Sequence, residues 1–179
     1  MGILLAIIGI ILGLIVLLMF IALFIKREYT VEREVDIAKP TVQVFDYIKY
    51  IKNQDQYSVW NQLDPNMQKT YTGADGTVGF MYAWDSQDKR AGKGEQQISS
   101  IKEGERVETA LHFIRPFEGR STAYMTTAAT GGNSTKVKWG INGKMNYPMN
   151  IMLLVLNMEK MMGKDLSGGL NNLKALLEK

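Results

Sequence analysis

The apolar stretch from Ile3 to Ile25 constrains this chain more than any other feature, because it contains only Ile, Leu, Val, Phe, Met, Ala and Gly. No Asp, Glu, Lys or Arg precedes Lys26. As a helix with a rise of ~1.5 Å per residue, the stretch reaches about 35 Å, enough to cross a hydrocarbon core of ~30 Å. We predict a single-pass transmembrane anchor over residues 1–27 and one soluble domain over residues 28–179.

A cleaved signal peptide is the alternative interpretation of this segment. Such a peptide has a basic amino end, a shorter apolar core and a cleavage site of small residues. The segment has none of these, so a retained membrane anchor is favoured. Lys26 and Arg27 flank its carboxyl end, and the positive-inside tendency then places the soluble domain in the cytoplasm. This orientation rests on two charges.

Composition excludes several classes of chemistry. The chain has no cysteine and one histidine, His112, which rules out disulfides, thiolate metal sites and multi-histidine metal centres. We therefore expect no metal and no cofactor. A net charge of +3 without a dense Lys/Arg cluster gives no reason to expect a nucleic-acid partner. The segment Gly73 to Gly79 lacks the Lys-Ser/Thr ending of a phosphate loop, so no nucleotide site is expected.

Alternating apolar and polar residues after Lys26 predict a β-rich domain. A first strand is expected over Tyr29 to Ile37, followed by a helix that carries Val44, Phe45, Ile48 and Ile51, and by a second short helix over Asp55 to Gln62. Turn residues then separate six further segments, which predicts a meandering antiparallel sheet of seven strands. These segments are Met67 to Thr72, Val78 to Asp85, Gly92 to Ile101, Val107 to Ile114, Ser121 to Ala128 and Lys136 to Met145.

The sequence after Tyr147-Pro148 changes to a helical pattern that runs to about Leu177. An apolar stripe at ~100° per residue predicts one long amphipathic helix. Its first two turns, Met149 to Leu156, are apolar nearly all round except for Asn150. We therefore predict that these turns are the most deeply buried part of the helix.

Several short motifs occur in a characteristic order along residues 28–177. They are Ile37-Ala38-Lys39-Pro40 with Val44-Phe45-Asp46-Tyr47-Ile48, Trp60, Gly76-Thr77-Val78-Gly79, Gly92-Lys93-Gly94-Glu95-Gln96-Gln97-Ile98, Leu111-His112-Phe113-Ile114-Arg115-Pro116, Thr135-Lys136-Val137-Lys138-Trp139 and Gly168-Gly169-Leu170-Asn171-Asn172-Leu173-Lys174. With these motifs the chain resembles the START-like helix-grip superfamily, also called SRPBCC, and in particular its polyketide cyclase/dehydrase-like members. The resemblance implies an α+β fold in which a seven-stranded antiparallel sheet curves around the long C-terminal helix.

The resemblance also implies a concave, mostly apolar cavity between sheet and helix, which suits a hydrophobic small molecule or a lipid. The predicted lining residues are Trp60, Phe80, Tyr82, Trp84, Gln96, Leu111, Phe113, Trp139, Met152, Val155, Met158 and Met162. The same aromatic and methionine side chains could instead fill the space as an ordinary core. The sequence leaves both interpretations open.

Three functions follow from these features. The leading hypothesis is a membrane-anchored protein that binds a hydrophobic small molecule or lipid. The second is a cyclase-like or dehydratase-like enzyme on an apolar substrate, with Tyr82, Glu95 and His112 as catalytic candidates, although strict alternation turns His112 away from the cavity. The third is a membrane-tethered interaction module resembling the chaperone-activator branch of the superfamily. That module needs an apolar outer sheet face, against which Glu108, Lys136 and Lys138 argue.

Overall fold

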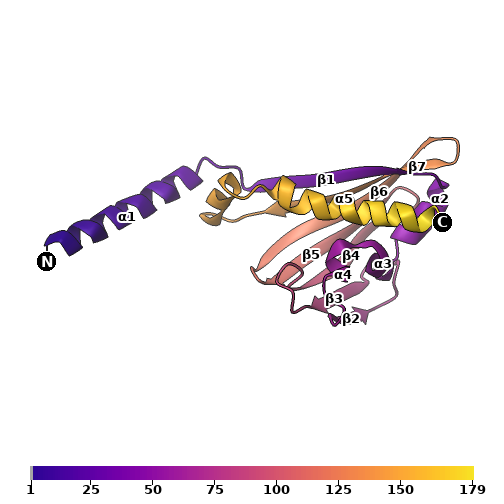
Figure 1. The fold of residues 1–179 in the computed structure, drawn as a ribbon, viewed down its shortest axis with the longest axis horizontal. Coiled ribbons are helices and arrows are strands. Elements are labelled where there is room, and N and C mark those ends of the chain that lie inside the picture. The colour runs from indigo at the N-terminus through magenta and orange to yellow at the C-terminus, as the bar shows by residue number, and fades with distance from the viewer. Residues whose placement is uncertain (1) are drawn as a thin grey trace.

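The structure, a computed structural model, describes residues 2–179, so Met1 of the predicted anchor lies outside it. An apolar helix leads into an antiparallel sheet, and a long helix ends the chain (Figure 1). In chain order the elements are α1 (Gly2–Ala22), β1 (Glu28–Ile37), α2 (Thr41–Ile48), the 3-10 helix η1 (Ile51–Asn53), α3 (Gln54–Tyr57), α4 (Val59–Gln62), β2 (Gln68–Thr72), β3 (Met81–Asp85), β4 (Lys93–Lys102), β5 (Arg106–Arg115), β6 (Gly119–Gly131), β7 (Ser134–Lys144), the 3-10 helix η2 (Met149–Leu154) and α5 (Met158–Leu177).

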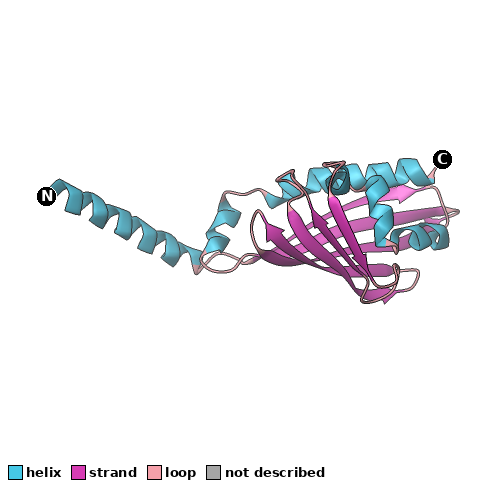
Figure 2. Ribbon diagram, turned by 90° about the horizontal axis from the view of Figure 1, so that it is seen from below, coloured by secondary structure: helices cyan, strands magenta, loops and turns pink. Residues whose placement is uncertain are grey.

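The sheet confirms the predicted seven antiparallel strands. Its order is β1-β7-β6-β5-β4-β3-β2, so each strand from β2 to β7 pairs with the next in sequence, and β1 closes the sheet beside β7. The helices of the domain all lie on one side of this curved sheet, and α5 runs along β1 (Figure 2). We call the side that faces the helices the concave face and the other side the outer face.

Several predicted boundaries differ from the structure; Ile51, expected in the first helix, lies in the separate η1, because α2 ends at Ile48. Two further differences have a cause in the backbone. The strand expected from Val78 begins at Met81, because Gly79 has a φ of 93°, which an extended strand does not accommodate. The helix expected over Asp55 to Gln62 is divided at Ser58, whose ψ of 124° is extended.

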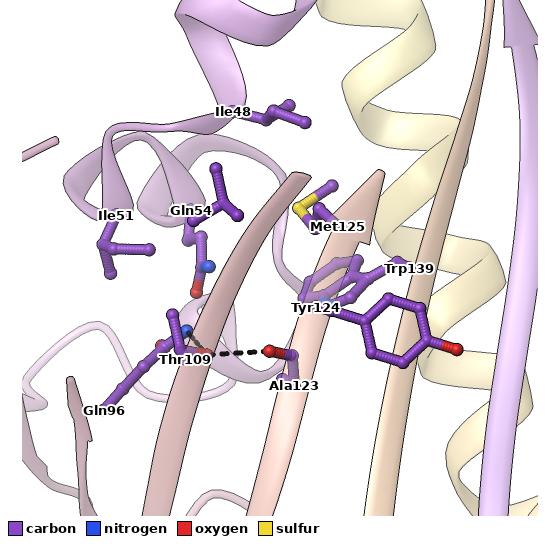
Figure 3. A pocket seen from close by; sticks show the side chains of 10 residues that line it. Ile48, Ile51, Gln54, Gln96, Thr109, Ala123, Tyr124, Met125 and Trp139 are labelled. Carbon is purple, nitrogen blue, oxygen red and sulfur yellow. Dashed lines mark hydrogen bonds between the residues drawn. The ribbon is translucent and has the colours of Figure 1, made fainter. Parts of the chain in front are cut away.

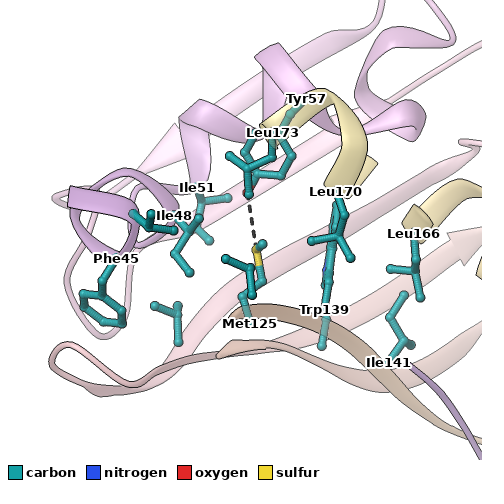
Figure 4. Close-up of a cluster of buried hydrophobic side chains, with 14 of the residues drawn as sticks. Phe45, Ile48, Ile51, Tyr57, Met125, Trp139, Ile141, Leu166, Leu170 and Leu173 are labelled. Atoms are coloured by element: carbon teal, nitrogen blue, oxygen red, sulfur yellow. Dashed lines mark hydrogen bonds between the residues drawn. The ribbon is translucent and has the colours of Figure 1, made fainter. Parts of the chain in front are cut away.

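The core lies between the concave face and the helices α2, α3 and α5 (Figure 4). At its centre the ring of Tyr57 meets Trp139 edge to face, with 5.7 Å between ring centroids. Leu166, Leu170 and Leu173 of α5 are fully buried against this layer. They repeat at helical spacing, so one stripe of α5 faces the sheet while the opposite stripe is exposed.

Ion pairs cover the outer face of the sheet. Lys136 pairs with Glu34 at 2.8 Å and Lys138 pairs with Glu32 at 3.1 Å, in each case across the β1–β7 ladder. The hydroxyl of Tyr124 donates to Glu32 at 2.6 Å. Burial, followed by this hydrogen bond, raises the pKa of Tyr124 to about 12.

Helix α1 projects away from the domain at the end of the sheet where β1 begins (Figure 1). Among its residues Gly2–Ala22, only Ala22 is buried. Within the described part of the chain, α1 is the one helix that is long and apolar enough to cross a membrane. Its exposed side chains distinguish it from the core helix of a soluble domain.

The predicted single helix after Pro148 is wrong in its first two turns. Residues 149–154 form the 3-10 helix η2, and α5 begins at Met158, where the side chain of Asn157 accepts a hydrogen bond from the Lys160 amide at 2.9 Å. The expected burial is reversed as well. Leu154 and Val155 are 66% and 79% exposed, whereas Asn150, the polar residue of the segment, is fully buried.

Candidate ligand-binding face

The predicted lining residues separate into three groups by burial. The buried group, which belongs to the core, is Phe80, Tyr82, Gln96, Leu111 and Trp139. The half-buried group, which packs against the edge of the core, is Trp60, Trp84, Phe113, Met158 and Met162. Met152 and Val155 form the exposed group, because they belong to the segment before α5 and not to α5 itself. The structure therefore brings together the first two groups and separates the third from them.

The deep half of the concave face is filled by the protein's own side chains. Between η1, α3 and strands β4–β7 lies a cavity of about 10 Å³ (Figure 3). That volume corresponds to roughly one water molecule. Gln96 donates to the hydroxyl of Thr109 at 3.1 Å, and Thr109 donates to the carbonyl of Ala123 at 3.3 Å, so these two side chains are held in place by hydrogen bonds. The ligand-sized cavity implied by the resemblance is not present in this half.

The other half of the concave face, next to the beginning of β1, has a floor of small residues. Register places Gly94 opposite Phe113, Phe113 opposite Gly119, and Ser121 opposite Gly143. These four small residues lie on strands β4, β6 and β7, and Phe113 of β5 lies between those of β4 and β6. We call them the small-residue shelf: Gly94, Gly119, Ser121 and Gly143.

Two aromatic rings lie flat on this shelf, one from each side. Tyr29 of β1 covers Gly143, and a Cβ at Gly143 would collide with its ring. Trp84 of β3 covers Gly94, where a Cβ would lie 2.6 Å from Cζ2 of the indole. The indole Nε1 donates to the carbonyl of Ala91 at 2.9 Å, which fixes the orientation of the ring. The glycines therefore give the rings access to the backbone of the sheet.

The chemistry of the shelf is mostly apolar with one polar corner. Phe113 meets Trp84 edge to face, with 6.2 Å between centroids. Burial raises the pKa of the Tyr29 hydroxyl, and the neighbouring Ser121 side chain offsets part of this rise. Two hydroxyl groups thus lie at the β1 side of an aromatic surface. Such a surface suits an apolar molecule with one hydrogen-bonding group.

Tyr29, Gly119, Ser121 and Gly143 were absent from the residues predicted to line the site. The signal that could have found them is glycine within a strand, which often marks the close approach of a ring, a backbone or a ligand. Reading that signal requires the register between strands, which the sequence of one strand does not contain.

The three catalytic candidates lie on opposite sides of the sheet. Tyr82 is on the concave face, where its hydroxyl lies 3.5 Å from Sδ of Met67, and burial followed by the charge of Asp55 raises its pKa. Glu95 and His112 are cross-strand partners on the outer face, with 4.0 Å between Oε2 and Nδ1. The outward position of His112 agrees with the alternation of β5. Among residues 2–179 no group of three His, Asp or Glu side chains is placed to hold a metal ion.

Comparison with known proteins places the fold. No family model and no curated protein matches this sequence. Norcoclaurine synthase from Thalictrum flavum, solved with dopamine and hydroxybenzaldehyde, superposes with a TM-score of 0.62 at 10% identity, covering 84% of this chain and 86% of that one. Major latex-like protein 151 from Panax ginseng gives 0.59 at 12% identity, with coverages of 83% and 97%. A protein from Chromobacterium violaceum gives 0.60 at 13% identity, with coverages of 84% and 97%.

These likenesses confirm the helix-grip fold that the sequence predicted, with its seven-stranded antiparallel sheet and long C-terminal helix. At 10–13% identity they show the fold alone, because one fold carries many different sites.

Proposed function

We propose that this chain is a membrane-anchored protein that binds a hydrophobic small molecule or a lipid, and that the ligand lies on the small-residue shelf. The observation that carries the proposal is the shelf itself, where half-buried aromatic rings cover strand glycines at the end of the sheet from which α1 leaves. An apolar ligand would take the position of the Tyr29 ring. Its polar group would then meet the hydroxyl of Ser121, which lies opposite Gly143.

The packed deep half of the concave face favours the shelf over the interior. Admitting a drug-sized ligand near Gln96 would require rearranging fully buried residues such as Tyr57 and Ile98. Displacing buried side chains from a close-packed core costs several kcal/mol. Tyr29 and Trp84 are half-buried and lie at the edge of the core, so moving them costs less.

The second part of the proposal is that α1 anchors the chain in a membrane. Five residues connect α1 to β1, which holds the shelf close to whatever surface α1 enters. A short tether raises the effective concentration of the shelf toward molecules dissolved in a bilayer. Among the solved neighbours, norcoclaurine synthase is described in complex with small aromatic molecules, which is compatible with a binding role for the fold.

The geometry does not favour the two alternative functions. A cyclase-like or dehydratase-like enzyme would need its acid and base on the ligand side of the sheet, whereas Glu95 and His112 face outward. An interaction module of the chaperone-activator type would need an apolar outer face, whereas Glu32, Glu34 and their lysine partners cover part of it.

A pair of substitutions on β7 tests the shelf. Gly143→Ala adds a methyl group in the space over the shelf that the Tyr29 ring fills and the ligand would take, and Gly140→Ala adds the same group against Tyr124 on the outer face. We expect the full chain in lipid nanodiscs to bind a pyrene-labelled fatty acid, and Gly143→Ala to weaken this binding at least tenfold while Gly140→Ala leaves it unchanged. Absence of binding by the unaltered chain, or equal affinities for both variants, would contradict the proposal.

A further inference from the structure

A group of exposed apolar side chains lies at the same end of the domain as α1. Four belong to η2 and the residue after it, and the fifth is at the tip of the β5–β6 hairpin, which register places at the sheet end where β1 begins. We call this group the apolar rim: Phe117, Met149, Met152, Leu154 and Val155. Phe117 and Val155 are 81% and 79% exposed. Exposed apolar side chains gathered at one end of a domain mark an interaction surface.

The buried side chain of Asn150 connects the apolar rim to α1 by hydrogen bonds. Nδ2 of Asn150 in η2 donates to the carbonyl of Ala22 at 2.7 Å and to that of Ile25 at 3.0 Å. These carbonyls belong to the last turn of α1 and the residues after it, where a helix lacks its regular i+4 donors. The contact fixes the level of η2 relative to α1, so the rim begins where the apolar helix ends.

Cationic side chains lie beside the apolar rim, close to the end of α1. Lys26, Arg27 and Lys144 line an open groove of about 470 Å³ together with Glu28, Tyr29 and Thr30. The guanidinium of Arg27 lies 6.0 Å from the ring centre of Tyr147, and Lys144 lies 3.9 Å from the exposed carboxylate of Glu28. Three cations against one carboxylate leave the groove positive. A positive, partly aromatic surface beside an apolar one is typical of contact with an anionic lipid headgroup layer.

We propose that the apolar rim is a second membrane contact, which seats the domain in the headgroup layer of the leaflet where α1 emerges. This inference rests on the proposed anchoring of α1. We assign a lipid bilayer as the partner of the apolar rim because Asn150 connects the rim directly to the end of α1. Any segment held beside the end of a spanning helix lies at headgroup depth, where apolar side chains are stabilised. The exposed residues of η2 are thereby explained without a protein partner.

The absence of cysteine makes a clean test possible, since each introduced thiol is the only one in the chain. Single variants Val155→Cys, Phe117→Cys, Val42→Cys and Ile11→Cys carry a nitroxide in nanodiscs of phosphatidylcholine with phosphatidylglycerol. Accessibility to oxygen and to a water-soluble nickel complex then reports depth. Val42 is the matched control, because it is 71% exposed but lies in α2, which follows the far end of β1.

We expect labels at Val155 and Phe117 to show high oxygen and low nickel accessibility, the label at Val42 the reverse, and the label at Ile11 the deepest position. Aqueous behaviour at Val155 and Phe117 with a deep Ile11 would overturn the rim contact and leave the anchor intact. An aqueous Ile11 would overturn the anchor on which the inference rests. Shielding of Val155 from both agents would mean that protein covers the rim, which also overturns the assignment to lipid.

Discussion

One amide side chain determines how the apolar helix joins the domain. Asn150 is fully buried, and its Nδ2 donates to two backbone carbonyls, that of Ile25 and that of Ala22, which also accepts from the Ile25 amide at 3.4 Å. A buried polar group without a partner destabilises a fold by about 1–3 kcal/mol, so the interaction specifies one geometry strongly. A leucine at this position would fill the space but leave the Ile25 carbonyl without the amide donor.

We predict that Asn150→Ala loosens this junction without unfolding the domain. The substitution removes both donors, so the free energy that holds α1 against η2 falls by about 1–3 kcal/mol. Distances between nitroxides at Ile11 and Val42, measured by pulsed electron resonance in nanodiscs, should spread over a visibly broader range. Asn171→Ala, at an exposed position of α5, is the control. An unchanged distribution for Asn150→Ala would show that other contacts fix the helix.

Two half-buried tyrosines predict how the free energy of unfolding changes at alkaline pH. Burial and the nearby Asp55 raise the pKa of Tyr71 to about 12, and burial with Glu32 raises that of Tyr124 to about 12. In the unfolded chain these groups ionise near pH 10. Their contribution is therefore complete below pH 10 and is lost as the pH rises toward 12, where only the unfolded chain has gained the charge.

Urea unfolding of the full chain in micelles at a series of pH values measures this loss. Tyr124→Phe should flatten the alkaline decline, because phenylalanine does not ionise. A decline of equal steepness in Tyr124→Phe and in the unaltered chain would mean that Tyr124 contributes nothing to it.

At the scale of elements, strands could be predicted from sequence and the segment before α5 could not. Strand alternation has a period of two, and each apolar residue such as Val137 or Ile141 meets its partners inside the same domain. Residues 149–156 also show a helical period, but several of their apolar side chains are exposed and do not pack into the core of the domain. The local sign of the true boundary was Asn157, an N-cap residue followed by Glu159 in the first turn.

The candidate binding site could likewise be predicted only in part from the sequence. Trp84 and Phe113 could be assigned to the concave face from alternation alone, and the structure places them there. The shelf beneath them could not be assigned, because its residues have little or no side chain and acquire meaning only when the register aligns Gly143 with Tyr29. Apolar patterning identifies surfaces that fill space, whereas the space itself follows from pairing between strands.

Helix α5 is held close to the sheet by Gly169, which gives a prediction at this scale. A Cβ there would lie 2.7 Å from Cζ3 of the buried Trp139 and 3.4 Å from the carbonyl of Tyr57. Alanine gains about 1 kcal/mol of helix propensity over glycine, but overpacking a core costs about 1–3 kcal/mol. We expect Gly169→Ala to lower the free energy of unfolding by up to about 2 kcal/mol.

The exposed position Asn171 on the same helix provides the contrast. Asn171→Ala should raise the free energy of unfolding by about 0.5 kcal/mol, since it gains propensity without a clash. Both values come from urea titrations followed by circular dichroism. If Gly169→Ala were as stabilising as Asn171→Ala, the close approach of α5 to Trp139 would not contribute to the fold.

At the scale of the whole molecule, the helix, the rim and the shelf meet at one end. Helix α1 leaves beside the first residues of β1, and the shelf lies across the strand ends that pair with that part of the sheet (Figure 1). The ion-paired outer face and the far end with α2 point elsewhere. In the proposed arrangement, a ligand leaving the bilayer would therefore reach the shelf over a short path.

This arrangement predicts that delivery from a bilayer depends on the length of the connection while intrinsic affinity does not. Inserting a flexible Gly/Ser segment between Arg27 and Glu28 separates α1 from β1 and lowers the effective concentration of the shelf at the membrane. Stopped-flow quenching of tryptophan by the pyrene-labelled fatty acid would measure both modes of delivery. The rate should fall several-fold when the probe is preloaded in the nanodisc and stay constant when it is added from detergent micelles. Equal slowing in both would indicate damage to the shelf, and no slowing in either would show that capture does not begin at the membrane.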